Sequence, residues 1–231
     1  MALTRVKNPG NFTVDGNVGI GTSSFNSKLE VKGESSNGSV RVIPNSDNAE
    51  ASIGYYQDTA GTNMTDRWVA GVGGWSNTNQ FTIGNSGSPK LKIDTSGRVT
   101  MPSQPSFFAY LNNTFTGVGL VPFDNTVYNT GNHFNTSNGR FTAPVTGVYM
   151  FTVIMTSGTV QTARHQFLAV NTTRYRDMFE GDDFAVNSEK HASALLRLTA
   201  NDVVDFRNGV SMTVQGGGHY YYSAFMGHLL G

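Results

Sequence analysis

The chain of 231 residues contains no cysteine, which excludes a disulfide scaffold, a thiolate zinc site and a cysteine nucleophile. It is also poor in charge, since charged residues make up 14% of the chain where about 25% is usual. Its sixteen basic residues balance sixteen acidic ones, so the net charge gives no sign of binding to nucleic acid. The longest apolar run, residues 148–155, is interrupted by Thr152 and is too short to insert into a membrane.

Small polar residues take the place of the missing charges. The sequence holds 22 Asn, 25 Thr and 20 Ser, together with 27 Gly. Thr favours strands, and Asn and Gly favour the tight turns that join them, so this composition predicts an all-β protein. Residues 1–8 carry basic side chains without an apolar segment behind them, and we therefore expect no secretory signal.

Residues 1–101 contain short apolar segments separated by Gly, Asn and Asp. Residues 12–20 alternate about Asp15 and Gly16, and residues 91–101 repeat this hairpin pattern. Strands this short need partners to be stable. Four longer segments lie between the two patterns and predict a small sheet: residues 40–43, 51–56, 67–72 and 80–83. We expect a fibre or stalk element together with a compact sheet module.

Two prolines, Pro102 and Pro105, predict a linker at residues 102–105. Beyond it the strands lengthen and turn signals recur, which predicts a jelly-roll sandwich head over residues 106–231. Within the head, residues 188–198 have some helical character. Because residues 194–198 and 204–206 alternate around Asn201 and Asp202, a hairpin fits better than a helix.

The segment 148–155 is apolar on both faces. Side chains at 149, 151 and 153 point one way, and those at 148, 150 and 154 point the other way. A sandwich strand normally leaves one face in water. We therefore expect a second sheet or another subunit to cover the second face.

A group of aromatic, Asn and Gly residues in the head is spaced as in the globular domain of complement component one, subunit q, which shares the jelly roll of tumour necrosis factor. These residues are Phe123, Asn129, Phe134, Phe141, Gly147, Tyr149 and Phe151. Val153 stands where the family pattern has an aromatic residue, and residues 225–230 resemble the closing strand of the family. The resemblance implies a ten-stranded jelly roll and a homotrimer. The residues expected to pack in the core or at the trimer interface are then Phe123, Phe134, Phe141, Tyr149, Phe151, Phe225 and Leu229.

Residues 16–24, followed by residues 28–33, resemble a segment of bacteriophage tail-fibre stalks, although Phe25 replaces the proline that usually follows the serine. A fibre-like stalk and a trimeric head together predict a tail-fibre or tail-tip protein of a virion. The head would attach to a glycan or protein of the host surface, and the N-terminal part would contact other virion proteins. The alternative is a purely structural virion protein, such as a capsid decoration or baseplate fibre.

The residues that bear chemistry predict a binding protein rather than an enzyme, with no cofactor and no metal. Of the five histidines, His191 has a carboxylate nearby, Glu189, and two ligands alone do not make a metal site. Asp182 and Asp183 favour a solvated turn over metal binding or catalysis. Receptor contact is predicted for Tyr220, Tyr221 and Tyr222 after a triple glycine, with Asp182 and Asp183 as second choice. Packing at a trimer axis is the competing explanation for the tyrosine rings, and we favour it for most of them.

Overall fold

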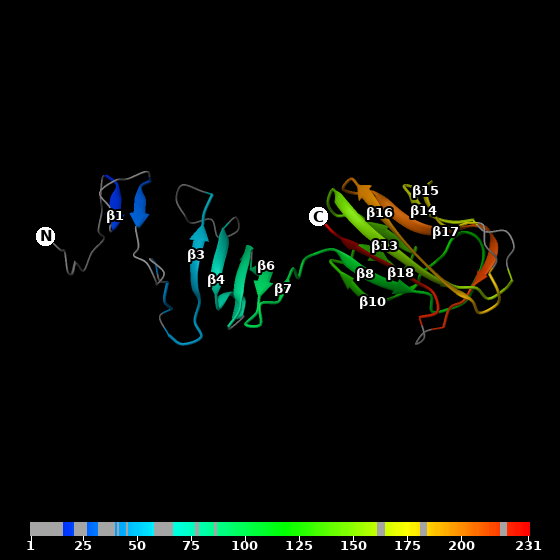
Figure 1. Ribbon diagram of the computed structural model, residues 1–231, viewed down its shortest axis with the longest axis horizontal. Helices are drawn as coiled ribbons and strands as arrows, with labels where there is room; N and C mark the ends of the chain where they lie inside the picture. Colours follow the sequence, from blue (N-terminus) through cyan, green and yellow to red (C-terminus); the bar gives the residue numbers. More distant parts are fainter. Residues whose placement is uncertain are drawn as a thin grey trace. The chain divides into compact units, whose positions relative to one another are not determined.

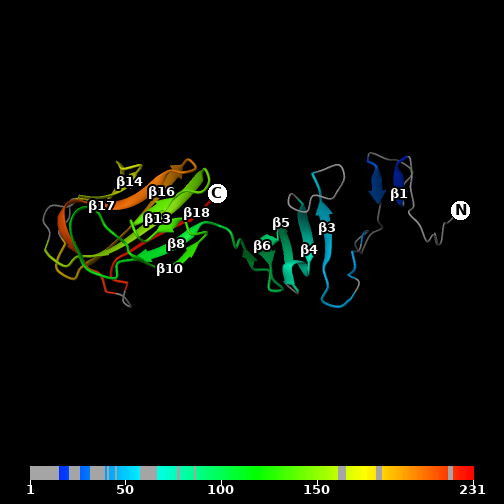
Figure 2. The same ribbon diagram turned by 180° about the vertical axis from the view of Figure 1, so that it is seen from behind.

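The computed structural model describes residues 16–20, 27–31, 40, 42–44, 46–57, 67–76, 79–85, 87–160, 165–180, 184–217 and 221–231. The chain divides into two compact units, Met1–Val99 and Thr100–Gly231, each shown in Figures 1 and 2. The division into residues 1–101, 102–105 and 106–231 stays a prediction. None of the helices in the described ranges is long and apolar enough to cross a membrane.

The first unit contains a parallel strand pair and an antiparallel sheet. Strands β1 (Val18–Ile20) and β2 (Leu29–Val31) form the pair. The sheet has the order β3-β4-β5-β6-β7 and consists of β3 (Ala51–Tyr55), β4 (Trp68–Val72), β5 (Phe81–Asn85), β6 (Ser88–Ile93) and β7 (Val99–Thr100). A single 3-10 turn, η1 (Gly74–Ser76), is the one helical element among the described residues.

The two hairpin predictions for this unit have different outcomes. The second is confirmed, because β6 and β7 are neighbours and Asp94 closes their turn by accepting hydrogen bonds from the amides of Ser96 and Arg98. For the first, residues 12–15 lie outside the described part, and Val18–Ile20 pairs with β2 in parallel. Of the four predicted sheet segments, residues 42 and 43 lie in no strand. Short apolar segments indicate which residues are buried, but they do not determine which strand pairs with which.

The second unit is a two-sheet sandwich, which confirms the predicted all-β, jelly-roll fold class. One sheet has the order β10-β8-β18-β13-β16, and the other runs β11-β12-β17-β14-β15 with β9 also paired to β17. Its eleven described strands are β8 (Ser106–Tyr110), β9 (Phe115–Leu120), β10 (Asn125–Thr130), β11 (Phe134–Asn135), β12 (Arg140–Thr142), β13 (Gly147–Thr156), β14 (His165–Val170), β15 (Thr173–Glu180), β16 (Glu189–Leu198), β17 (Val203–Val214) and β18 (Ala224–Leu229). The resemblance implied ten, and β11 is only two residues long.

Strand β16 is extended, as predicted, but the predicted hairpin between β16 and β17 is wrong. Strand β16 pairs with β13, while β17 pairs with β14 in the other sheet. The turn at 199–202 passes the chain from one sheet to the other, and the carboxylate of Asp202 accepts a 2.8 Å hydrogen bond from the amide of Thr199 there. Both strands direct alternate apolar side chains into the same core. Alternation shows which face is buried and leaves the pairing partner open.

Aromatic rings fill the space between the two sheets. The ring centroid of Phe107 lies 4.7 Å from that of Phe134 and 5.1 Å from those of Phe141 and Phe225. The residues that the family spacing singled out are buried here, namely Phe123, Phe134, Phe141, Tyr149, Phe151 and Phe225, and Leu229 is half-buried. Asn129 of the same pattern is hydrogen-bonded to the backbone of Phe134. Its side-chain NH2 group donates to the Phe134 carbonyl, and its side-chain oxygen accepts from the Phe134 backbone amide.

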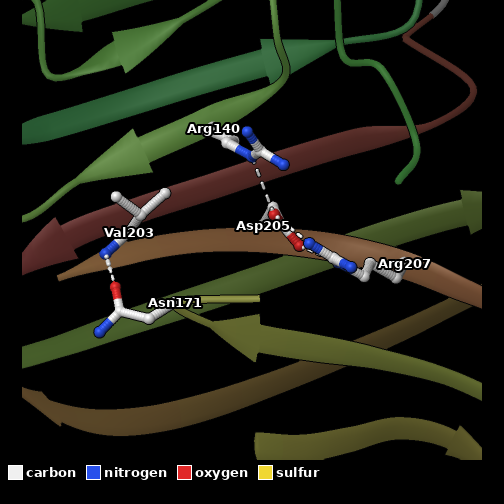
Figure 3. Close-up of polar contacts among 5 residues, drawn as sticks. All are labelled: Arg140, Asn171, Val203, Asp205 and Arg207. Atoms are coloured by element: carbon white, nitrogen blue, oxygen red, sulfur yellow. Dashed lines mark hydrogen bonds and ion pairs between the residues drawn. The ribbon is translucent and has the colours of Figure 1, made fainter. Parts of the chain in front are cut away.

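A buried carboxylate ties β12 to β17. Asp205 of β17 is 1% exposed, and its side chain accepts hydrogen bonds from Arg140 Nε at 3.1 Å and Arg207 Nε at 2.6 Å (Figure 3). The hydrogen bond to Asp205 raises the pKa of Arg207 above its usual value. Nearby, Asn171 accepts a 2.9 Å hydrogen bond from the amide of Val203. Since each ionic group is paired, this cluster serves to hold the sheet together.

Candidate functional site: an apolar sheet face and a polar pocket

Strand β13 has apolar side chains on both of its faces, as the sequence predicts. Tyr149, Phe151 and Val153 point into the sandwich and are fully buried. The side chains of Val148, Met150, Thr152 and Ile154 point outward and remain half-buried in the single chain. The outward side chains therefore belong to a second surface that the sandwich itself does not cover.

The strand register extends this surface across the whole sheet. Phe108 of β8 is paired with Tyr128 of β10 and with Met226 of β18, and Met226 is paired in turn with Thr152 of β13. In the next row, Met150 lies between His228 and Leu195. Side chains of paired residues share a face. We call this surface the β13 face, formed by Phe108, Tyr110, Tyr128, Met150, Ile154, Leu195, Tyr221 and Met226.

Aromatic contacts join the rings at one side of the β13 face. The ring centroid of Tyr221 lies 4.8 Å from that of Tyr110 and 5.5 Å from that of Phe108, and Phe108 and Tyr128 lie 6.3 Å apart. Tyr128 is nevertheless 48% exposed, and Leu195 on the far strand is 64% exposed. An outward face with exposed apolar side chains on all five strands of a sheet is typical of an interface with another protein chain.

A polar pocket of about 730 Å³ lies at one end of the sandwich. Strands β13, β16 and β17 and neighbouring loop segments supply its lining: Thr114, Thr156, Gly158, Asn187, Glu189, Thr213, Gln215, Gly216 and Tyr222. Gln215 donates a 2.6 Å hydrogen bond to Asn187, and the hydroxyl of Thr156 donates to the carbonyl of Tyr222. Hydroxyls, amides, one carboxylate and one aromatic ring suit an uncharged polar ligand.

The predicted tyrosine cluster is divided between these two surfaces. Tyr221 packs on Phe108 and Tyr110 in the β13 face, whereas Tyr222 lines the pocket. Gly217 lies close to this ring, since a Cβ at that position would be 2.7 Å from Tyr222. Tyr220, Asp182 and Asp183 lie outside the described residues. The binding roles of all five residues stay predictions.

The described residues hold no group of three or more His, Cys, Asp or Glu side chains that could bind a metal. His191 and Glu189 do meet, with 2.7 Å between Nε2 and Oε1, on the outer strand β16. Elsewhere, a hydrogen bond from Arg174 lowers the pKa of the Asp177 carboxyl. This carboxylate stays ionised at neutral pH, which is the opposite of what a general acid needs.

The sequence reasoning missed Phe108, Tyr110 and Tyr128. A signal for them was present, because Phe107 and Phe108 are adjacent and must therefore point to opposite faces of a strand. Strand β8 therefore has apolar side chains on both faces, as residues 148–155 do. Tyr128 could not be placed in this way, since a register shift in β10 between Thr126 and Tyr128 breaks the simple alternation.

Comparison with known proteins identifies the second unit. The C1q domain model matches residues 106–230. Among curated proteins, the complement C1q tumor necrosis factor-related protein 3 of Mus musculus and that of Homo sapiens are each 31% identical over 129 residues. These matches cover 55% of this chain and 51% of the relatives, so the chain spans about half the length of the curated relatives it matches.

Similar solved structures each match about half of this chain. The globular domain of a zebrafish complement 1qA protein matches with a TM-score of 0.45 and 18% identity, over 55% of this chain and 98% of that one. Murine APRIL matches with a TM-score of 0.45 and 11% identity, over 55% of this chain and 99% of that one.

These relatives correct the functional prediction. The prediction of a bacteriophage tail-fibre or tail-tip protein is wrong, as are the virion location and the host attachment that went with it, because the curated relatives are mammalian complement C1q tumor necrosis factor-related proteins. The stalk resemblance of residues 16–24 rested on about twenty residues rich in Gly, Ser and Asn. Such a composition indicates turns and short strands, which occur in many β proteins.

Proposed function

The chain belongs to the C1q domain family, and from this premise we propose that its C-terminal unit is a homotrimeric head that acts by binding and not by catalysis. The observation that carries the proposal is the β13 face, an apolar surface that one chain leaves open. Each copy of the chain would cover this face of its neighbours. The homotrimer is the assembly implied by the family resemblance.

The energetics favour burial of the β13 face. A buried aromatic side chain removes on the order of 200 Å² from water, worth roughly 25 cal/mol per Å². Two polar groups near its centre already have partners, because the hydroxyls of Thr152 and Ser193 are hydrogen-bonded to each other at 2.8 Å. Covering the face therefore leaves this polar pair satisfied.

Trimer formation also bears on binding. Three chains would present three copies of the pocket that contains Asn187, Glu189 and Tyr222. Three weak sites on one rigid assembly engage a repetitive ligand with higher avidity than a single site does. Catalysis has less support, since the carboxylates of Asp177 and Asp205 are engaged by arginine side chains.

The test is a charge placed on the β13 face. Phe108→Glu puts a carboxylate on the outward side of β8, where it leaves the sandwich core unchanged but cannot be buried against another chain. Light scattering of the parent should give about three times 24.9 kDa and that of Phe108→Glu should give the single-chain mass. Circular dichroism should show a folded variant.

Tyr175→Glu is the matched control, because Tyr175 is an exposed aromatic residue on β15 of the other sheet. It should remain a trimer. A parent protein that is monomeric, or a Phe108→Glu variant that assembles like Tyr175→Glu, would contradict the proposal.

A further inference from the structure

The sheet of the first unit has two faces of opposite character. On one face, Val69 and Thr82 are buried, and a Cβ on Gly84 would lie 2.8 Å from the Trp75 side chain of η1. This face is therefore closed by the chain itself. The paired residues Ile53 and Ala70, Ala70 and Ile83, and Ile83 and Leu91 lie on the opposite face.

The second face is apolar and open to solvent. Its five most exposed side chains are Ile53, Tyr55, Trp68, Val72 and Phe81, which are between 41% and 58% exposed. Among the side chains that β3, β4 and β5 place on this face, Asn85 alone is polar and none is charged. We call it the Trp68 face. A shallow groove of about 210 Å³, lined by Ile53, Val72 and Phe81 among others, lies on it.

The lack of charge limits what can cover this face. A partner that recognised it by ion pairs would find no counter-charge on the three strands, so the covering surface must itself be apolar. The same face of another copy meets this condition. Three one-layer sheets arranged about a common axis would place three Trp68 faces together in a closed apolar interior.

The size of the face favours copies of this chain over an independent partner. With about 200 Å² for an aromatic side chain, the five exposed side chains leave roughly 500 Å² per chain. A standard interface buries about 800 Å² per partner. The Trp68 face is thus too small for a stable complex by itself, but is sufficient as a second contact between chains that are already joined elsewhere.

The chain supplies that connection. Only five residues, 101–105, separate β7 from β8, and extended they span at most about 18 Å. Association of the C-terminal units would therefore hold the N-terminal sheets of the same assembly at an effective concentration on the order of millimolar. At that concentration a small apolar interface is well populated.

We propose that the Trp68 face is a second self-association surface, covered by the Trp68 faces of the other chains of the same assembly. This inference rests on the proposed homotrimer and adds a second contact to it. It gives residues 51–93 the role of joining the chains outside the C1q domain.

The test uses the absence of cysteine in the natural chain. Val72→Cys places a single thiol on the Trp68 face, and Ser96→Cys places one in the exposed turn between β6 and β7 of the same sheet, in a residue of nearly the same shape as the serine it replaces. Labelling of the full chain with a polymer-linked maleimide should be at least about tenfold slower at position 72 than at position 96, because the reagent reaches a covered thiol only through opening of the interface. Adding Phe108→Glu, which separates the chains, should abolish this difference.

The outcomes distinguish the inference from the proposed function. If light scattering shows a trimer while Cys at position 72 reacts as fast as Cys at position 96, the Trp68 face is open or has another partner in nature, and only the further inference is overturned. Slow labelling that persists in the Phe108→Glu background would mean that the chain covers its own face, which also overturns it. A monomeric parent overturns both proposals. Ile53→Cys repeats the measurement if Val72→Cys does not fold.

Discussion

Tyr149 shows how a single residue of the family pattern contributes to stability. Its ring is fully buried between the sheets, and its hydroxyl donates a 2.7 Å hydrogen bond to the carbonyl of Val145. Burial raises the pKa of the Tyr149 phenol above its usual value of 10.0. The folded state therefore favours the neutral phenol more than the unfolded state does.

This shift predicts a loss of stability in alkali. A group whose pKa is raised on folding contributes stability below its unfolded pKa, near 10, and that contribution is lost as the pH rises through the folded pKa. The free energy of unfolding of the parent, measured by chemical denaturation, should therefore fall as the pH rises above about 10. Tyr149→Phe should cost about 1 kcal/mol at neutral pH for the lost hydrogen bond and should flatten the alkaline decline.

Tyr175→Phe, at an exposed position on β15, is the control and should follow the parent at every pH. An alkaline decline of the same slope in Tyr149→Phe would show that another group is responsible for it.

At the scale of single elements, β18 explains why the closing strand carries a glycine. Gly227 is paired with Phe107 on one side and with Phe151 on the other. A Cβ at this position would lie 2.6 Å from Phe107 Cε1 and 2.7 Å from Phe151 Cδ1. Both rings belong to the core and are packed against other rings, so neither can move away freely.

Gly227→Ala should thus destabilise the head by about 2 kcal/mol, the usual cost of overpacking a filled core. The shift in the midpoint of urea unfolding measures this. Gly231→Ala serves as the control, because a Cβ there meets no atom within 4 Å. Equal midpoints for the two variants would mean that the rings of Phe107 and Phe151 move more easily than their packing indicates.

At the scale of the whole molecule, the two units have different requirements for stability. The head encloses its own core of aromatic rings, whereas the N-terminal sheet is a single layer with one open apolar face. A fragment of residues 100–231 should therefore fold and assemble without the rest of the chain. The N-terminal sheet should depend on assembly.

The two proposed contacts also predict a difference in the strength of association. Because the Trp68 face adds to the β13 face in the same assembly, the full chain should dissociate at a lower concentration than the fragment 100–231. Sedimentation equilibrium over a dilution series compares the two. Dissociation of both at the same concentration would indicate that only the β13 face joins the chains.

The sequence by itself determined the fold class and the family of the head. The small polar residues and turn signals predicted an all-β chain, and alternation in residues 148–155 correctly placed Tyr149 and Phe151 inward and Met150 and Ile154 outward. These properties follow from local geometry, because the side chains of a strand alternate whatever its partner is. The same local character misled the functional prediction, since a short stalk-like segment carries little information about partners.

The tertiary structure alone decided which residues come together. It assigned β16 and β17 to different sheets, divided Tyr221 and Tyr222 between an apolar face and a polar pocket, and brought Arg140 to Asp205 across 65 positions of sequence. It also aligned residues from four separate strands into the Trp68 face. Strand register and sheet order determine such contacts, and both depend on packing between distant segments, which no local pattern of residues encodes.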